Sequence, residues 1–94
     1  GYVAEPVYAW RDAIGAAGWP AGEPAFRADA SNSAAEQALQ AGMHHDGLHF
    51  FPLADGRGLL VCNHEYADDG LLHPDGLADW DAEKVRKCQA AHGV

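Results

Sequence analysis

Basic residues are scarce in this chain. Of its 94 residues only 6 are Lys or Arg, against 14 Asp or Glu, and the formal net charge is −8 at pH 7. Nucleic-acid binding and attachment to anionic membranes both rely on clustered basic side chains, so this balance argues against either partner. An acidic protein that acts on an anionic substrate needs cations, which makes bound metal a natural hypothesis; a solvated acidic surface is the simpler alternative.

Long apolar runs and familiar catalytic motifs are also absent from the sequence. No stretch of about 18 apolar residues exists, so no membrane-spanning helix is predicted, and no signal peptide is recognisable. The patterns GxSxG, P-loop, HExxH and CxxC are missing, which argues against serine-nucleophile, nucleotide-binding and standard zinc sites. If the chain belongs to an enzyme, metal-assisted hydrolysis fits its residues better than covalent serine chemistry.

The length and the two cysteines set further limits. A chain of this size allows one domain at most. Because it begins with Gly1 and stops at Val94, just after an apparent helix end, we expect a fragment of a larger protein. We expect Cys62 and Cys88 to be unpaired small apolar residues, with a single disulfide between them as the alternative.

A β-hairpin is the clearest element that the sequence predicts. Residues 49–53 and 59–65 are predicted strands, each with an apolar run, on either side of Asp55-Gly56, a pair typical of tight turns. The second run begins with four apolar residues that are typical of a buried strand. Antiparallel pairing of the two runs would place residues 45–49 opposite residues 63–65.

A short helix is predicted before the hairpin. Ser33 and Glu36 have the spacing of a capping box, in which each side chain bonds to the other residue's backbone N–H. We expect this helix to end near Ala41 and to be followed by Gly42 as its C-terminal glycine.

A second helix is predicted at the end of the chain. Asp79 or Asp81 would cap it, and it would run to about His92, with Gly93 after its end. Its spacing predicts that one face carries Val85, Cys88, Gln89 and His92 and the other carries Lys84, Arg86 and Lys87.

The first third of the chain predicts little regular structure. Residues 2–10 contain strand-forming side chains, but Pro6 lacks a backbone donor, so we expect an edge strand or a break. Residues 11–30 are rich in Gly, Ala and Pro and predict a loop-rich linker. Trp19 and Phe26 are its candidate anchors.

Asn63-His64-Glu65 is the best candidate for a functional site. These polar residues follow directly on a buried strand, where an unpaired polar group is costly. Alternate strand residues share a face, so Asn63 and Glu65 should point together and His64 away from them. Two oxygen ligands suit a hard cation such as calcium, and Glu65 could also bridge a transition metal. The alternative is a strand end with a solvated carboxylate.

His44, His45 and Asp46 form a second candidate cluster. The expected hairpin would bring them to the same end as Asn63-His64-Glu65. They could ligate metal or hold phosphate through a protonated imidazole, although no standard zinc spacing is present. The alternative is a helix-to-strand connection with exposed histidines.

The remaining charged residues have plainer explanations. Turns at residues 68–70 and 73–76 and helix capping account for most of an acidic tract near the C-terminus. Arg27 and Arg57 are lone cations for which a surface role is more natural than a phosphate clamp. The tract comprises Asp68, Asp69, Asp75, Asp79, Asp81 and Glu83.

Several stretches of the chain resemble one protein family in a fixed order. The similarity is to the N-terminal part of PhoX-type alkaline phosphatases, and it is nearly continuous over two thirds of the chain. Residues 2–10 also look like that family's first strand. The matching segments are residues 29–38, 42–53, 58–66 (GLLVCNHEY), 68–76 (DDGLLHPDG) and 83–94 (EKVRKCQAAHGV).

The resemblance implies a fold and an activity. The family consists of large bacterial β-propeller enzymes that hydrolyse phosphomonoesters with calcium and iron, and its members are usually exported by the twin-arginine route to the periplasm or beyond. Residues 1–94 would then be an incomplete N-terminal portion of a propeller domain, with residues 11–30 as a loop-rich linker inside it. The expected fold of this portion is an α+β fragment: a β-hairpin plus two short helices, part of a larger β-propeller.

The resemblance also implies how the fragment relates to the chemistry. Its partners would be the rest of the propeller and a phosphomonoester, with metal-assisted phosphoryl transfer as the mechanism. The iron thiolate and several carboxylate ligands come from later blades, so we expect the fragment alone to be inactive. Cys62 and Cys88 stand where a small or apolar residue is expected, and neither is carried over as the iron ligand. The alternative is a non-catalytic calcium-binding or structural packing module.

Overall fold

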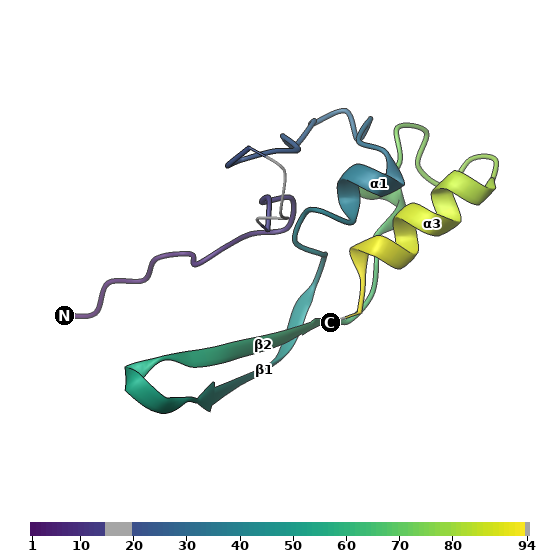
Figure 1. The fold of residues 1–94 in the computed structure, drawn as a ribbon. Coiled ribbons are helices and arrows are strands. Elements are labelled where there is room, and N and C mark those ends of the chain that lie inside the picture. Colours follow the sequence, from purple (N-terminus) through teal and green to yellow (C-terminus); the bar gives the residue numbers. More distant parts are fainter. Residues whose placement is uncertain (15–19, 94) are drawn as a thin grey trace.

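The computed structural model describes residues 1–14 and 20–93. It is an elongated molecule of 49 × 29 × 26 Å with two distinct parts. A helical unit contains α1, α2 and α3, and a hairpin of β1 and β2 extends away from it, as does an N-terminal arm of residues 1–9 (Figure 1). The elements in chain order are α1 (Ala34–Gln37), β1 (His45–Pro52), the 3-10 turn η1 (Ala54–Gly56), β2 (Gly58–His64), α2 (Asp69–Leu72) and α3 (Ala82–Ala91).

Side-chain caps start α1, α2 and α3. The predicted capping box is confirmed, because the Ser33 hydroxyl accepts from the Glu36 N–H and the Glu36 carboxylate accepts from the Ser33 N–H at 2.8 Å. Asp81 caps α3 by accepting from the Lys84 N–H at 2.8 Å. Asp68 caps α2, so residues 68–70 begin a helix and the predicted turn there is wrong. Each cap satisfies a backbone donor that a helix start leaves without a partner.

Helix α1 is shorter than the sequence predicts. It ends at Gln37 rather than near Ala41, because the chain then turns so that Gln40 forms a β-bridge with Ala13. Gly42 does not end the helix. A side chain at Gly42 would collide with the Ala91 carbonyl and the His64 ring, so this glycine allows a close approach of three segments.

Helix α3 has the predicted extent and cap, but the predicted faces are wrong. Lys84, Lys87 and Ala91 are buried, whereas Val85 is 46% exposed. The lysine stems lie along the helical unit and deliver their ammonium groups to backbone carbonyls. Lys87 Nζ lies 2.6 Å from the Ala30 carbonyl oxygen, and Lys84 Nζ lies 3.0 Å from that of Ala78.

The first third of the chain contains no strand among the residues described. Residues 2–10, predicted as an edge strand or a break, are irregular, because no neighbouring strand supplies hydrogen bonds to them. The predicted anchor Phe26 is confirmed: its ring packs edge-on against Trp10 at 5.6 Å. Trp19 lies outside the described residues. The predicted turn at residues 73–76 is confirmed by a bond from the Gly76 N–H to the His73 carbonyl.

The predicted hairpin is confirmed, and it is longer than expected. Phe51 pairs with Leu59, His49 with Val61, and His45 with His64 in an antiparallel ladder. The four apolar residues at the start of the second run were predicted to be buried, and this prediction is wrong. Leu59 is 55% exposed and Leu60 is 48% exposed. Among the described residues the sheet has two strands, and most of their large apolar side chains are exposed.

The apolar core lies in the helical unit and is small. Met43, Leu72 and Ala91 are almost fully buried, and Trp10 and Cys88 pack against them. Cys62 and Cys88 are free thiols, as predicted. Among the described residues no helix has the length and apolar character needed to cross a membrane.

Candidate functional site

The two polar clusters predicted from the sequence meet at the base of the hairpin. We use the name hairpin base for the six residues concerned: His44, His45, Asp46, Asn63, His64 and Glu65. His45 pairs with His64 across the ladder. β2 ends at His64, and the next N–H, that of Glu65, donates to the His44 carbonyl at 2.9 Å. The backbone therefore holds both clusters in a fixed relation.

A β-bulge shapes the centre of the hairpin base. The register shifts between His45 and Leu48, so that Asp46 and Gly47 together face Asn63 on the other strand. The Asn63 side-chain oxygen lies where any side chain at position 47 would stand. Gly47 is therefore required for the position of the Asn63 amide.

Aromatic rings surround the histidines of the hairpin base. The His45 ring lies 4.7 Å from the His64 ring and 4.8 Å from the Tyr8 ring, which it meets edge-on. His44 stacks on Tyr66 at 3.8 Å. His44 also has a φ of 50°, a left-handed conformation that costs a non-glycine residue about 1 kcal/mol or more and is often found at functional sites.

The surroundings of His64 favour its neutral form. Burial lowers the pKa of His64, and the neighbouring His45 lowers it further. The buried atom His64 Nδ1 has no hydrogen-bond partner among the described residues, and the same is true of His44 Nε2. Each of these two imidazoles thus has one ring nitrogen for which the described residues supply no hydrogen bond.

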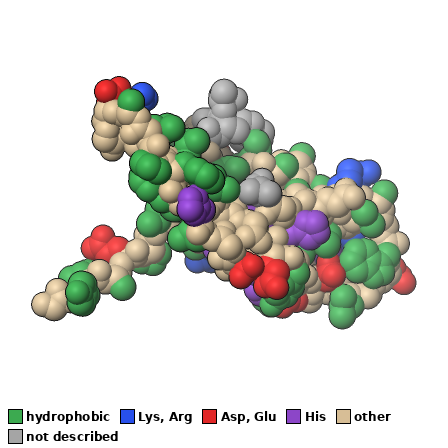
Figure 2. Space-filling view, turned by 90° about the horizontal axis from the view of Figure 1, so that it is seen from below, with side chains coloured by type: hydrophobic (Ala, Val, Ile, Leu, Met, Phe, Trp, Pro, Cys, Tyr) green, Lys and Arg blue, Asp and Glu red, His purple; other side chains and the backbone are tan. Residues whose placement is uncertain are grey.

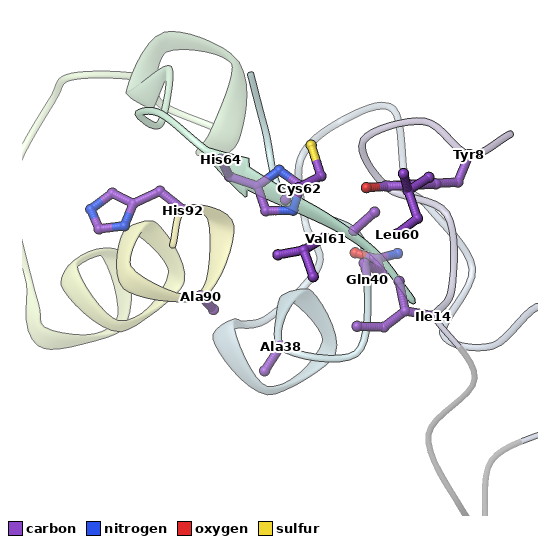
Figure 3. A pocket seen from close by; sticks show the side chains of 12 residues that line it. Tyr8, Ile14, Ala38, Gln40, Leu60, Val61, Cys62, His64, Ala90 and His92 are labelled. Atoms are coloured by element: carbon purple, nitrogen blue, oxygen red, sulfur yellow. The ribbon is translucent and has the colours of Figure 1, made fainter. Parts of the chain in front are cut away.

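A hollow of 420 Å³ opens beside His64. Figure 3 shows it between β2, the end of α1 and the end of α3, with His64 and Cys62 on one side and Tyr8 near them. Burial raises the pKa of Tyr8, and a hydrogen bond with Cys62 raises it further, so the phenol is protonated at neutral pH. No pattern in the sequence connects Tyr8 to this site, because Tyr8 lies 37 residues before β1 begins at His45. Tyr66 directly follows Asn63-His64-Glu65 in the sequence, so its place beside the hairpin base could have been predicted.

The carboxylates of the hairpin base do not complete a metal site with the other residues that the structure describes. Asp46 and Glu65 are exposed. Nowhere in residues 1–14 and 20–93 do three His, Cys, Asp or Glu side chains gather closely enough to hold a metal ion. Asn63 and Glu65 offer the oxygens that a hard cation prefers, but a full set would need ligands from elsewhere. The assignment of the six residues as metal ligands stays a prediction.

The acidic tract serves the fold, as its plainer explanation predicted. Asp68 and Asp81 are helix caps. Asp75 contacts Lys84 Nζ at 2.6 Å, and this lysine lowers the pKa of the Asp75 carboxyl. Arg27 is not a lone cation, because its guanidinium forms a bidentate ion pair with the Glu36 carboxylate. The two nitrogen–oxygen distances are 2.7 and 3.0 Å. Arg57, at the hairpin tip, is exposed as expected.

A further polar cluster in the helical unit was missed by the sequence analysis. The buried His73 ring places Nε2 3.3 Å from the Asp69 carboxylate, one turn before it in the chain. Burial raises the pKa of the Cys88 thiol, and Asp69 raises it further through its charge and a hydrogen bond. Cys88 is therefore a protonated thiol in the core and does not have the character of a nucleophile.

Comparison with known proteins identifies the family. The family model described as alkaline phosphatase PhoX matches residues 1–94. Among solved structures, PhoX from Pseudomonas fluorescens in complex with vanadate, a transition-state analogue, superposes with a TM-score of 0.74 at 31% identity. The match covers 92% of this chain and 14% of that one. No curated protein matches the chain. The α+β arrangement of a hairpin with short helices thus has a counterpart in a solved phosphatase, and the chain belongs to the PhoX alkaline phosphatase family.

Proposed function

We propose that this chain is the N-terminal portion of a metal-dependent phosphomonoesterase that releases inorganic phosphate. The observation that carries the proposal is the family match over residues 1–94 together with the structural likeness to a phosphatase solved with vanadate. The chain spans 14% of that phosphatase, so we assign the activity to the full-length protein. The portion alone is inactive in this proposal, because its hairpin base lacks a complete catalytic set.

The proposed role of the chain is to supply part of the metal and phosphate environment. Asn63 and Glu65 would provide oxygen ligands, with calcium and iron as the ions, and His44, His45, His64 and Asp46 would lie around them. Bound cations supply neutralisation of the charge on the phosphoryl oxygens. The contribution of the chain itself is position: the bulge fixes the Asn63 amide, and the Glu65 N–H bond to His44 fixes the backbone at the carboxylate.

The remainder of the proposal concerns the assembly and its location. The hairpin would form early strands of a β-propeller whose other blades lie in the rest of the polypeptide. Residues 1–94 would be an incomplete part of that domain, with residues 11–30 as a loop-rich linker. The enzyme would be exported and act in the periplasm or outside the cell on phosphomonoesters.

A second function is supported by one observation. Glu65 is exposed, and no described residue forms an ion pair with it. A carboxylate in that position could bind calcium for structural reasons alone, or bind nothing. The chain would then be a non-catalytic calcium-binding or packing module of the enzyme.

Replacement of Glu65 by Gln in the full-length protein separates the two functions. A ligand role predicts that kcat/KM for a phosphomonoester falls by at least roughly 10–100-fold and that bound metal is lost, because loss of even an outer-shell partner of a metal ligand has an effect of this size. Metal content is measured by mass spectrometry of the purified protein. Glu5→Gln, on the exposed N-terminal arm, is the matched control and should leave both quantities unchanged. Unaltered turnover with a lower Tm in Glu65→Gln would support the structural module instead.

A further inference from the structure

The Tyr8 ring lies against one face of the hairpin base. His45 pairs with His64 across the ladder, and directly paired residues share a face. Cys62 shares that face, because it lies two residues before His64 on β2. Tyr8 contacts residues of both strands there: its ring meets the His45 ring edge-on at 4.8 Å, and its side chain forms a hydrogen bond with Cys62.

A hydrogen-bonded turn fixes the chain directly after Tyr8. The N-terminal arm and the hairpin project from the same side of the helical unit (Figure 2), and this turn lies at the base of the arm. The Asp12 carboxylate accepts from the Ala9 N–H at 2.8 Å, and the Asp12 carbonyl accepts from the Ala41 N–H at 2.8 Å. Ala41 lies four residues before His45 in the chain. These bonds therefore set the position of Tyr8 relative to the strand that carries His45.

The His45 imidazole depends on ring contacts for its orientation. It is exposed, and an exposed side chain without packing partners samples several rotamers. Among the described residues its ring contacts are with Tyr8, at 4.8 Å, and with His64, at 4.7 Å. The angle between the Tyr8 and His45 rings is 89°, which is the edge-to-face arrangement that aromatic pairs prefer, whereas His64 is tilted at 55°. The Tyr8 ring is thus the better-oriented of the two contacts.

We propose that Tyr8 is a positioning residue of the hairpin base, which acts by holding the His45 imidazole against His64. The inference rests on the proposed function, because it takes His45 to belong to the metal and phosphate environment of a phosphatase. A residue of the N-terminal arm then contributes to a site whose other members lie in residues 44–46 and 63–65. The hydrogen bond with Cys62 has a supporting part, since it ties the phenol to β2.

Two substitutions of Tyr8 in the full-length protein separate the ring from its apolar bulk. Tyr8→Leu keeps an apolar side chain, and kcat/KM for p-nitrophenyl phosphate should fall about 3–10-fold, the range that loss of one aromatic pair allows. Tyr8→Phe keeps the ring and should retain nearly the wild-type value. Tyr2→Leu, on the exposed part of the same arm, is the matched control and should change nothing. Wild-type turnover in Tyr8→Leu, or an equal loss in Tyr8→Phe, would overturn the proposal.

A double-mutant cycle tests whether Tyr8 acts through His45. In a His45→Gln background, Tyr8→Leu should lower kcat/KM by less than about 1.5-fold, because the group that Tyr8 positions is gone. A general loss of folding would lower the activity by the same factor in both backgrounds, so equal factors would refute the proposal. Full activity of His45→Gln itself would refute it as well, since His45 would then have no part in the reaction.

NMR of the metal-free full-length protein provides a readout that needs no activity. With histidine labelled by carbon-13 at Cε1, the signal missing from His45→Gln identifies the His45 ring. This signal should shift in Tyr8→Leu and stay in place in Tyr8→Phe, because the ring current of an aromatic side chain at position 8 acts on it. The same signal in all three proteins, in an active enzyme, would overturn this inference alone. The expected shifts in a protein that releases no phosphate would confirm the contact and refute the proposed function.

Discussion

The helical unit and the hairpin differ in how many large apolar side chains they contain and in how much of that apolar surface they bury. The helical unit buries few large apolar side chains and is held by caps, ion pairs and two buried lysines that reach backbone carbonyls. The hairpin has nearly all the large apolar side chains of the middle of the chain and buries almost none of them. The difference indicates that polar contacts within the described residues hold the helical unit together, whereas the hairpin presents apolar side chains that no described residue covers.

A charge placed on the hairpin should have the largest effect on stability. In the full-length protein we expect Leu60→Asp to lower the free energy of unfolding by about 3 kcal/mol or more, because a buried carboxylate without a partner is costly. The matched control is Ala54→Asp at the tip, which should change stability by less than about 0.5 kcal/mol. Urea unfolding of the three proteins measures the difference, and equal values for the two variants would contradict the comparison.

Loss of a buried lysine should have the next largest effect. Lys87 is 4% exposed, and its ammonium is the donor to the Ala30 carbonyl at 2.6 Å. Lys87→Met keeps most of the apolar stem but removes this donor, which should cost about 1.5–3 kcal/mol for a hydrogen bond from a charged group. Arg86→Met, one residue earlier on the exposed face, is the control. Unfolding midpoints that do not separate the two variants would show that the lysine is dispensable.

The helix cap of α1 should have a smaller effect. Ser33→Ala removes the hydroxyl that accepts from the Glu36 N–H, which should cost about 1 kcal/mol. Ser33→Asp keeps an acceptor at the same position and should restore most of the loss. The comparison of the two unfolding curves isolates the cap from the change in side-chain size.

The smallest expected effect is a dependence of stability on pH. The Arg27 guanidinium and the Ser33 N–H lower the pKa of Glu36. This carboxylate therefore stabilises the folded state above its ordinary pKa, near 4.5, and that stability is lost as the pH falls through the lower folded value. Glu36→Gln should flatten this part of the profile in unfolding experiments between neutral and acid pH. An unchanged slope would show that the ion pair contributes nothing.

The sequence allowed prediction of features that depend on neighbouring residues. The capping box at Ser33, the cap at Asp81, the hairpin and the meeting of the two histidine clusters all follow from spacing and turn chemistry. The features that could not be predicted depend on distant contacts. The spacing puts Lys84 and Lys87 on a helix face with Arg86, but only the fold shows the carbonyls of Ala78 and Ala30 that these two lysines reach.

In the candidate site, too, features set by neighbouring residues could be predicted and features set by distant contacts could not. The turn predicts that residues 45–49 lie opposite residues 63–65, but the exact pairing, the bulge opposite Asn63 and the Tyr8 ring could not be predicted. The prediction that the second strand is buried was wrong. An apolar run shows that a segment is suited to burial, but it does not show which part of the protein covers that segment. In this chain the described residues supply no such cover.

Hydrolysis of a phosphomonoester by the purified full-length protein tests the central claim most directly. With calcium and iron supplied, the account predicts release of inorganic phosphate from p-nitrophenyl phosphate with saturation kinetics, and loss of that activity after chelation of the metals. A folded full-length protein that releases no phosphate under these conditions, at neutral or alkaline pH, would contradict it.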